Sequence, residues 1–215
     1  MGSRLGPTGF TISDDQGIYE MNTTIRRRRP AFDREEGVRI AQELFHARGY
    51  DAVSIADLTK AMAIVPPSLY AAYGSKLDLF ERAMKRYVST SALPVDEILA
   101  LEGEPPEVLT NLFVTVAKHY TQHPVLRGCM VTEAMRADDP EAAAIAVRIA
   151  SPAIAEIRDY VAKHAQPEKV DGITDYVVMT LRGLSSYACL GYAQVKLVEC
   201  SKVAGRVFES EFALG

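Results

Sequence analysis

The sequence of 215 residues lacks tryptophan, has only three cysteines and contains no long hydrophobic run, and each absence excludes a class of protein. Cys129, Cys189 and Cys200 are widely spaced and form no Cys-x-x-Cys pair, so neither a disulfide framework nor a cysteine-based zinc site is expected. A reducing compartment is therefore the natural setting. No apolar run approaches the ~18 residues that a membrane span needs, and the N-terminus lacks the apolar segment of a secretory signal. We expect a cytoplasmic protein with no membrane partner.

The motifs of common catalytic sites are also missing. The chain has no glycine-rich phosphate loop, no nucleophile elbow and no zincin motif. Of its four histidines, only His119 and His123 have the four-residue spacing of metal ligands on a helix, and no carboxylate-rich motif accompanies them. We predict that the protein is not an enzyme and holds no metal and no cofactor. A helical enzyme is the alternative, for which the sequence offers no motif.

The charge is unevenly distributed along the chain. The net charge of -4 argues against a general binder of polyanions. However, residues 26–86 carry 12 basic and eight acidic residues and open with four consecutive arginines, whereas residues 87–215 carry 11 basic and 17 acidic residues. A short basic arm before a folded domain is a recurrent way to hold phosphates or to enter a minor groove. The alternative is a solvated charge run.

Residues 1–25 have no periodicity and predict a disordered leader, whereas from Asp33 onward the pattern is helical and strand alternation is nearly absent. An acidic capping box at Asp33 predicts a first helix that ends before Gly49. Ser54 begins a short second helix, residues 66–73 form a short third helix, and Ser75 caps a long fourth one. Two short helices joined by a tight turn have the geometry of a helix-turn-helix motif, although such pairs also occur in ordinary bundles.

The remaining sequence predicts further helices. One follows Pro105 and ends at His123, a shorter one covers about residues 125–137, and a long one begins at Pro140. Pro152 falls inside the long helix, so we expect a kink or a break there. The last two helices are expected to span about residues 171–190 and 194–210.

The side chains of the second short helix carry a resemblance to a known family. Residues 62–80, MAIVPPSLYAAYGSKLDLF, resemble the helix-turn-helix of the TetR family of transcriptional regulators, especially members with a Pro-Pro-Ser-Leu-Tyr recognition helix. The preceding stretch, FDREEGVRIAQELFHARGYDAVSIADLTKAM, resembles the first two helices of that family. Ala63 departs from the pattern, because the family usually has glycine at this turn. Alanine there costs more than glycine if the residue must adopt a positive φ.

The resemblance implies an all-α fold, with an N-terminal three-helix helix-turn-helix DNA-binding domain and a C-terminal helical bundle for ligand binding and dimerisation. We place the leader at residues 1–25, the DNA-binding domain at 26–75 and the bundle at 76–215.

The DNA-binding candidates combine the basic arm with the helix-turn-helix. They are Arg26, Arg27, Arg28, Arg29, Ser54, Val65, Pro66, Pro67, Ser68, Tyr70, Tyr73 and Lys76. The resemblance puts Ser54, Tyr70 and Lys76 near phosphates, whereas Tyr73 also fits a core position. The helix lacks the arginine, asparagine and glutamine that read bases by paired hydrogen bonds, so we expect specificity from methyl contacts, DNA shape and the arginine arm.

The family also implies a small-molecule pocket in the C-terminal bundle. The candidate lining residues are Phe113, Tyr120, Cys129, Met135, Tyr176, Met179, Arg182 and Tyr187, and plain core packing is the alternative for each. Arg182 lies in an apolar helix and needs a partner, which is either an anionic ligand or a carboxylate such as Glu133. Residues 173–193 are apolar on nearly all faces, which favours an interface and a homodimer.

These observations together predict a ligand-responsive transcriptional regulator, a repressor that binds palindromic, double-stranded operator DNA as a homodimer. An unknown small-molecule effector would release it. The alternative is a helical small-molecule-binding protein or a cysteine-based oxidant sensor with weak DNA binding.

Overall fold

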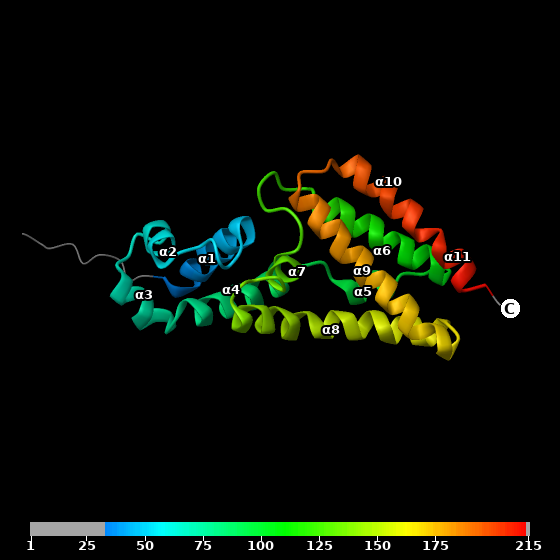
Figure 1. Ribbon diagram of the computed structural model, residues 1–215, viewed down its shortest axis with the longest axis horizontal. Helices are drawn as coiled ribbons and strands as arrows, with labels where there is room; N and C mark the ends of the chain where they lie inside the picture. Colours follow the sequence, from blue (N-terminus) through cyan, green and yellow to red (C-terminus); the bar gives the residue numbers. More distant parts are fainter. Residues whose placement is uncertain (1–32, 214–215) are drawn as a thin grey trace, which may run out of the picture. The chain divides into compact units, whose positions relative to one another are not determined.

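The computed structural model describes residues 33–213, and all regular elements in this range are helical (Figure 1). The all-α fold predicted from the sequence is therefore confirmed. These residues fall within one compact unit of the chain, residues 32–215. The predicted leader and the four arginines of the arm lie outside the described residues.

The first four helices follow the local signals of the sequence. Helix α1 (Arg34–Arg48) begins at Asp33, whose carboxylate accepts hydrogen bonds from two backbone N–H groups of the first turn, and it ends at Gly49 with φ of 79°. Helices α2 (Ile55–Ala61) and α3 (Pro66–Tyr73) form the short pair, and α4 (Lys76–Thr90) packs along α1. Caps depend on a few neighbouring residues, which is why their positions could be predicted closely.

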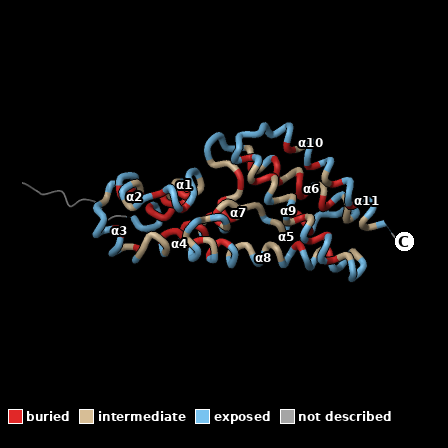
Figure 2. The backbone as a smooth tube through the Cα atoms, in the orientation of Figure 1, coloured by how far each residue is buried: buried red, intermediate tan, exposed pale blue. Residues whose placement is uncertain are grey.

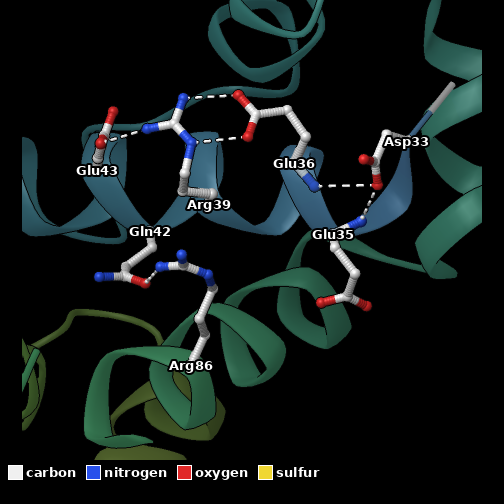
Figure 3. A network of polar contacts seen from close by, with 7 residues as sticks. All are labelled: Asp33, Glu35, Glu36, Arg39, Gln42, Glu43 and Arg86. Atoms are coloured by element: carbon white, nitrogen blue, oxygen red, sulfur yellow. Dashed lines mark hydrogen bonds and ion pairs between the residues drawn. The ribbon is translucent and has the colours of Figure 1, made fainter. Parts of the chain in front are cut away.

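Polar contacts along α1 are of two kinds (Figure 3). On the exposed face Arg39 bonds to Glu36 at 2.7 Å and to Glu43 at 2.5 Å. Exposed pairs of this kind contribute little to stability. On the opposite side, Gln42 is buried and its side-chain oxygen accepts a hydrogen bond of 2.6 Å from Arg86 of α4. The second contact fixes α1 on α4, because a buried amide that loses its partner is costly.

The turn between α2 and α3 contains Ala63, which has φ of 54°. It is the one non-glycine residue with positive φ among residues 33–213. The strain expected from alanine at this position is therefore present in the structure, and the turn keeps its left-handed geometry without glycine.

The C-terminal part contains seven further α-helices. They are α5 (Val95–Leu99), α6 (Pro105–His119), α7 (Met130–Ala134), α8 (Pro140–His164), α9 (Val170–Cys189), α10 (Gln194–Gly205) and α11 (Val207–Glu211), with a 3₁₀ turn at Pro167–Lys169 before α9. Helices α6, α9 and α10 pack on one another, and α8 packs against both α4 and α9 (Figure 1). The approach of α10 to α6 is close, because a Cβ atom added at Gly205 would lie 2.2 Å from Oγ1 of Thr110.

One helix was missed, and four expectations about the other helices are corrected. Helix α5 was not predicted, and α6 ends at His119 instead of His123. Helix α7 has five residues instead of the expected span of about 125–137, because a loop with Gly128 at φ of 72° precedes it. Of the kink or break expected at Pro152, the break is wrong, because α8 continues through this residue, whereas the kink stays a prediction. The last predicted helix is divided at Arg206 into α10 and α11.

The buried side chains form two clusters, with exposed stretches along α3 and α10 (Figure 2). The first cluster joins helices α1 to α4 with residues of α7 and the first half of α8, such as Met130 and Ile145. The second cluster lies among α5, α6, α8, α9, α10 and α11. Cys129 packs against both. The core of the first four helices thus extends across residue 75, where we place the boundary between the two domains.

Candidate nucleic-acid interface and ligand cavity

Helix α3 presents an apolar surface to solvent. Its period of 3.6 residues puts Leu69 and Tyr73 on the core side, where both are buried. Val65, the N-cap residue that precedes the helix, is 59% exposed, and Tyr70 is 48% exposed. Pro66, Pro67 and Ser68 are exposed as well. Within this face only Ser68 and Tyr70 have side chains that can form hydrogen bonds.

Tyr73 is a core residue, which corrects its place among the DNA-binding candidates. Its side chain is 2% exposed, and its hydroxyl donates a hydrogen bond of 2.9 Å to the backbone carbonyl of Arg34. Burial raises the pKa of Tyr73 to about 12. The residue ties the end of α3 to the start of α1.

Ser54 forms a complete capping box at the start of α2. Its hydroxyl accepts a hydrogen bond of 3.1 Å from the backbone N–H of Asp57, and Asp57 accepts one of 2.9 Å from the backbone N–H of Ser54. The hydrogen bond from the Ser54 hydroxyl is the largest cause that holds the pKa of Asp57 below its usual value. Ser54 is exposed, so the start of α2 is accessible at the surface.

Lys76 lies over an aromatic ring in this structure. Its ammonium group is 3.9 Å from the centroid of the Tyr50 ring. Partial burial lowers the pKa of Lys76, while Asp51 and Asp139 act in the opposite direction. Asp51 also accepts hydrogen bonds from the backbone N–H groups of Asp138, at 2.8 Å, and Asp139, at 3.4 Å. The loop after α1 is therefore tied to the N-terminus of α8.

A cavity of about 590 Å³ lies between the end of α4 and the C-terminal helices. Its lining comes from α4 to α9, and four of the eight predicted lining residues contribute to it, namely Tyr120, Cys129, Met135 and Arg182. Tyr87, Val131 and Ile154 are among the lining residues that we did not predict. A volume of this size is typical of a small-molecule site.

The other four predicted lining residues lie elsewhere. Phe113 is fully buried in the second cluster. Tyr176 packs near it and donates a hydrogen bond of 2.9 Å to the carbonyl of Ala204. Met179 is 63% exposed and Tyr187 48% exposed on the outer side of α9. Because α9 is apolar on nearly all faces, its sequence pattern did not distinguish the side that faces the cavity from the side that faces solvent.

Two tyrosines meet Cys129 on the cavity wall. Tyr87, Tyr120 and Cys129 all line the cavity, and the thiol of Cys129 contributes to the pKa shift of both phenols. Burial raises the pKa of both phenols well above the usual value. Both groups therefore stay protonated at neutral pH and remain hydrogen-bond donors. Tyr87 had a sequence signal, since it lies on the inward face of α4, but Cys129, which directly precedes α7, is distant from it in sequence.

Arg182 and Glu133 are not partners, which corrects one of the two expectations for Arg182. Glu133 accepts a hydrogen bond of 2.7 Å from Ser185 and one of 2.5 Å from Arg136. Arg182 is exposed at the cavity and forms no hydrogen bond or ion pair with another residue in the range 33–213. The anionic-ligand expectation for Arg182 stays a prediction.

The segment Arg127-Gly128-Cys129 connects three parts of the structure. Arg127 donates to the carbonyls of Ala188, at 2.6 Å, and Tyr192, at 2.5 Å, at the end of α9. The backbone N–H of Cys129 donates to Ser185 of α9 at 2.9 Å. These contacts hold the segment against α9.

The same segment contacts α1 through a histidine. The ring nitrogen Nε2 of His46 donates to the carbonyl of Gly128 at 3.3 Å. Burial lowers the pKa of His46, so the ring is neutral at neutral pH. Helix α1, helix α9 and the cavity residue Cys129 therefore meet at three consecutive residues.

A second, smaller cavity of about 350 Å³ lies on the other side of α7. Its wall includes His46 and Tyr50 from the α1 region and Met130, Glu133 and Ala134 from α7. Cys129, Val131 and Thr132 line the larger cavity instead. The five-residue helix α7 thus separates the two cavities.

Several large hydrophobic side chains are exposed on α9, on α10 and on the loop that joins them. They are Met179, Tyr187, Leu190, Tyr192, Val195 and Val203. A contiguous apolar patch on a folded chain is typical of an interaction surface. In the described part of the chain, no group of three or more His, Cys, Asp and Glu side chains is placed to hold a metal ion, and none of the helices has the length and apolar character that a membrane span requires.

Comparison with known proteins identifies the family. The sequence profile described as "Bacterial regulatory proteins, tetR family" matches residues 39–83, which run from α1 into α4. The chain is also 37% identical over 179 residues to the HTH-type transcriptional repressor BdcR of Escherichia coli, an alignment that covers 83% of this chain and 90% of that protein. The chain belongs to the TetR family.

Solved structures of TetR regulators share the fold. A cysteine mutant of the TetR family transcriptional regulator CifR, complexed with 26-bp double-strand operator DNA, is 28% identical with a TM-score of 0.72, covering 84% of this chain and 100% of that chain. A TetR regulator from Chloroflexus aurantiacus is 20% identical with a TM-score of 0.69, covering 85% of this chain and 96% of that chain, and shows the fold alone. The resemblance to the TetR family and the architecture of a helix-turn-helix followed by a helical C-terminal region are confirmed.

Proposed function

We propose that this TetR-family protein is a transcriptional repressor that binds palindromic operator DNA as a homodimer and is released when a small molecule fills the larger cavity. The observation that carries the proposal is the exposed, apolar face of α3, at the position of the second helix in a helix-turn-helix. Such a helix lies in the major groove with its N-terminal residues at the base edges. The relative BdcR is a repressor, and the related CifR mutant is complexed with operator DNA, which supports this reading.

We propose that the Pro-Pro-Ser-Leu-Tyr segment of α3 reads DNA mainly through thymine methyl groups. Val65, Pro66 and Pro67 are exposed, and none of their side chains can form a hydrogen bond. The C5-methyl of thymine is the apolar group that base pairs of unmodified DNA present in the major groove. Ser68 is the candidate for a base hydrogen bond, and Tyr70 and the start of α2 at Ser54 are candidates for phosphate contacts.

The apolar surface of α9 and α10 supports the proposed homodimer. A symmetric pair joined there would place two copies of α3 about one DNA turn apart on a palindrome. Arg26 to Arg29 lie outside the described residues, and we propose from the sequence that they contact phosphates or the minor groove. A regulator of transcription acts where the chromosome is, so a cytoplasmic location is part of the proposal.

Operator selection from random double-stranded DNA with the purified protein tests the proposal. We expect an enriched palindrome with thymines in each half-site. Salt-sensitive binding without any enriched sequence would contradict specific repression. Replacing all four arginines of the arm by glutamine should weaken binding and flatten its dependence on salt, and an unchanged salt slope would exclude the arm from the interface.

The contribution of methyl groups can be isolated on the selected operator. Replacing thymine by uracil removes the C5-methyl and leaves every hydrogen-bonding group in place. We expect the affinity to fall by about tenfold for a half-site contact of about 1–2 kcal/mol. The control replaces thymines outside the half-sites, where the affinity should not change.

The oxidant-sensor alternative gains no support from Cys189. Burial raises the pKa of its thiol to about 11, and a reactive cysteine needs a lowered pKa.

A further inference from the structure

The charged groups of the larger cavity are confined to its exposed rim. Asp96, Glu156 and Arg182 contribute to the wall, and all three are exposed. The buried part of the wall is apolar, as at Val116 and Ile157, which are each 2% exposed. A ligand that carries a charge into this part would find no opposite charge, and an uncompensated buried charge is costly.

The buried part of the wall does hold two strong hydrogen-bond donors. Tyr87 is 1% exposed and Tyr120 is 9% exposed, and both line the cavity. Cys129 lines the cavity as well, and its thiol influences the pKa of both phenols, so it lies near both hydroxyls. A thiol sulfur is only a weak hydrogen-bond acceptor.

A better acceptor would satisfy these donors. Exchanging a weak acceptor for an oxygen atom gains free energy, because buried donors that are poorly paired are destabilising. The acceptor must be neutral, since the surrounding wall offers no counter-charge. A carbonyl oxygen has two lone pairs and no proton, so it can accept from both phenols at once.

We propose that the larger cavity binds a neutral, mainly apolar molecule whose carbonyl oxygen accepts hydrogen bonds from Tyr87 and Tyr120. The apolar body of the molecule lies against the wall that includes Val116 and Ile157, and the rim charges remain in water. The inference rests on the proposed function in one respect only, which is that this cavity is the effector site. Binding of a ligand to the cavity is measured without DNA and therefore does not depend on operator binding.

Isothermal titration of the purified dimer with three probes of equal chain length tests the proposal. The probes are 2-nonanone, nonanoate and nonylamine, at a pH near 7. We expect 2-nonanone to bind at least tenfold more tightly than the two charged probes. Equal or tighter binding of nonanoate, or no binding of any probe, would overturn the proposal.

Two variants and a control locate the carbonyl. Tyr87→Phe and Tyr120→Phe each remove one hydroxyl, and each should weaken 2-nonanone binding by about two- to tenfold, the range of a single hydrogen bond. The control is Tyr176→Phe, which removes a hydroxyl that bonds to Ala204 away from this cavity and should leave the affinity unchanged. Unchanged binding in both cavity variants would overturn the proposal. If Tyr87→Phe fails to fold, Tyr120→Phe and the probe series still decide.

Failure of this proposal and failure of the proposed function are distinguishable. Operator selection with ligand-free protein tests DNA binding alone, and the titration tests the cavity alone. A protein that selects an operator but prefers nonanoate keeps the repressor function and loses the carbonyl ligand.

Discussion

Replacing Gly128 by alanine should lower the free energy of unfolding by about 2–4 kcal/mol. Gly128 has φ of 72°, and an added Cβ would lie 2.5 Å from Sγ of Cys189 and 2.9 Å from the carbonyl oxygen of Ser185. The cysteine can rotate, but the carbonyl belongs to the backbone of α9 and cannot move alone. The positive φ costs about 1–2 kcal/mol, and crowding adds about 1–3 kcal/mol. The reduced freedom of the unfolded chain returns about 0.4–1 kcal/mol.

Gly191→Ala is the matched control. Gly191 has φ of 87°, but nothing lies within 4 Å of its added Cβ. This variant carries the backbone strain without the crowding, so we expect a loss of about 1 kcal/mol. The difference between the two variants isolates the contact of the Arg127-Gly128-Cys129 segment with α9.

Denaturant unfolding at one fixed protein concentration measures both losses, because the apparent stability of a chain that associates with itself depends on concentration. Equal losses in the two variants would refute the reasoning, since they would show that α9 does not press against Gly128. A crystal structure of Gly128→Ala with α9 in its original position would refute it equally.

Three further predictions concern other parts of the fold. Ala63→Gly should raise the free energy of unfolding by about 0.5–1 kcal/mol, because the strain of the positive φ that is relieved is larger than the cost of the added freedom of the unfolded chain. The control Ala144→Gly, on the exposed side of α8, should lower the free energy of unfolding by about 1 kcal/mol in the same denaturant assay. Burial lowers the pKa of His46, so at pH values below about 6.5 the unfolded chain binds more protons at this residue than the folded chain does. The free energy of unfolding should therefore fall as the pH is lowered from about 6.5 through the pKa of His46 in the folded chain. His46→Gln should reduce this fall in thermal melts at pH 5 to 7, and the control His164→Gln, at the exposed end of α8, should keep it. Asp51→Ala removes the acceptor for the two backbone N–H groups that precede α8. The ratio of the operator affinity measured with 2-nonanone to the operator affinity measured without it should therefore move toward one. Glu43→Ala on α1 should leave this ratio unchanged.

The sequence predicted what depends on neighbouring residues. Asp33, Ser54 and Ser75 were recognised as caps because a cap needs only the next three residues, and each lies at a helix start in the structure. The family resemblance drew attention to the turn at Ala63, where the family usually has glycine, and this residue has φ of 54°. The family resemblance depended on this local pattern as well.

What the sequence could not predict depends on distant residues. The loop that ends at Gly128 is shaped by contacts to α1 and α9, about 60 to 80 residues away along the chain, and so α7 was expected to be longer than it is. The apolar pattern of α9 could not separate Met179, which faces solvent, from Val177, which is buried. The assignment of residues to the cavity failed at the same point, because an apolar side chain fits a core, a cavity or an interface equally well.

Helix α7 has a cavity on each side and only five residues, so it is a shared wall. Space that a ligand gains on the Cys129 side by displacing α7 is taken from the side that faces α1. Occupancy of the larger cavity and the position of α1 are then parts of one equilibrium. Thermodynamic linkage makes the effect of each ligand on the other equal in size. An effector that lowers the affinity for the operator by some factor has its own affinity lowered by the same factor when the operator is bound and holds α1 in place.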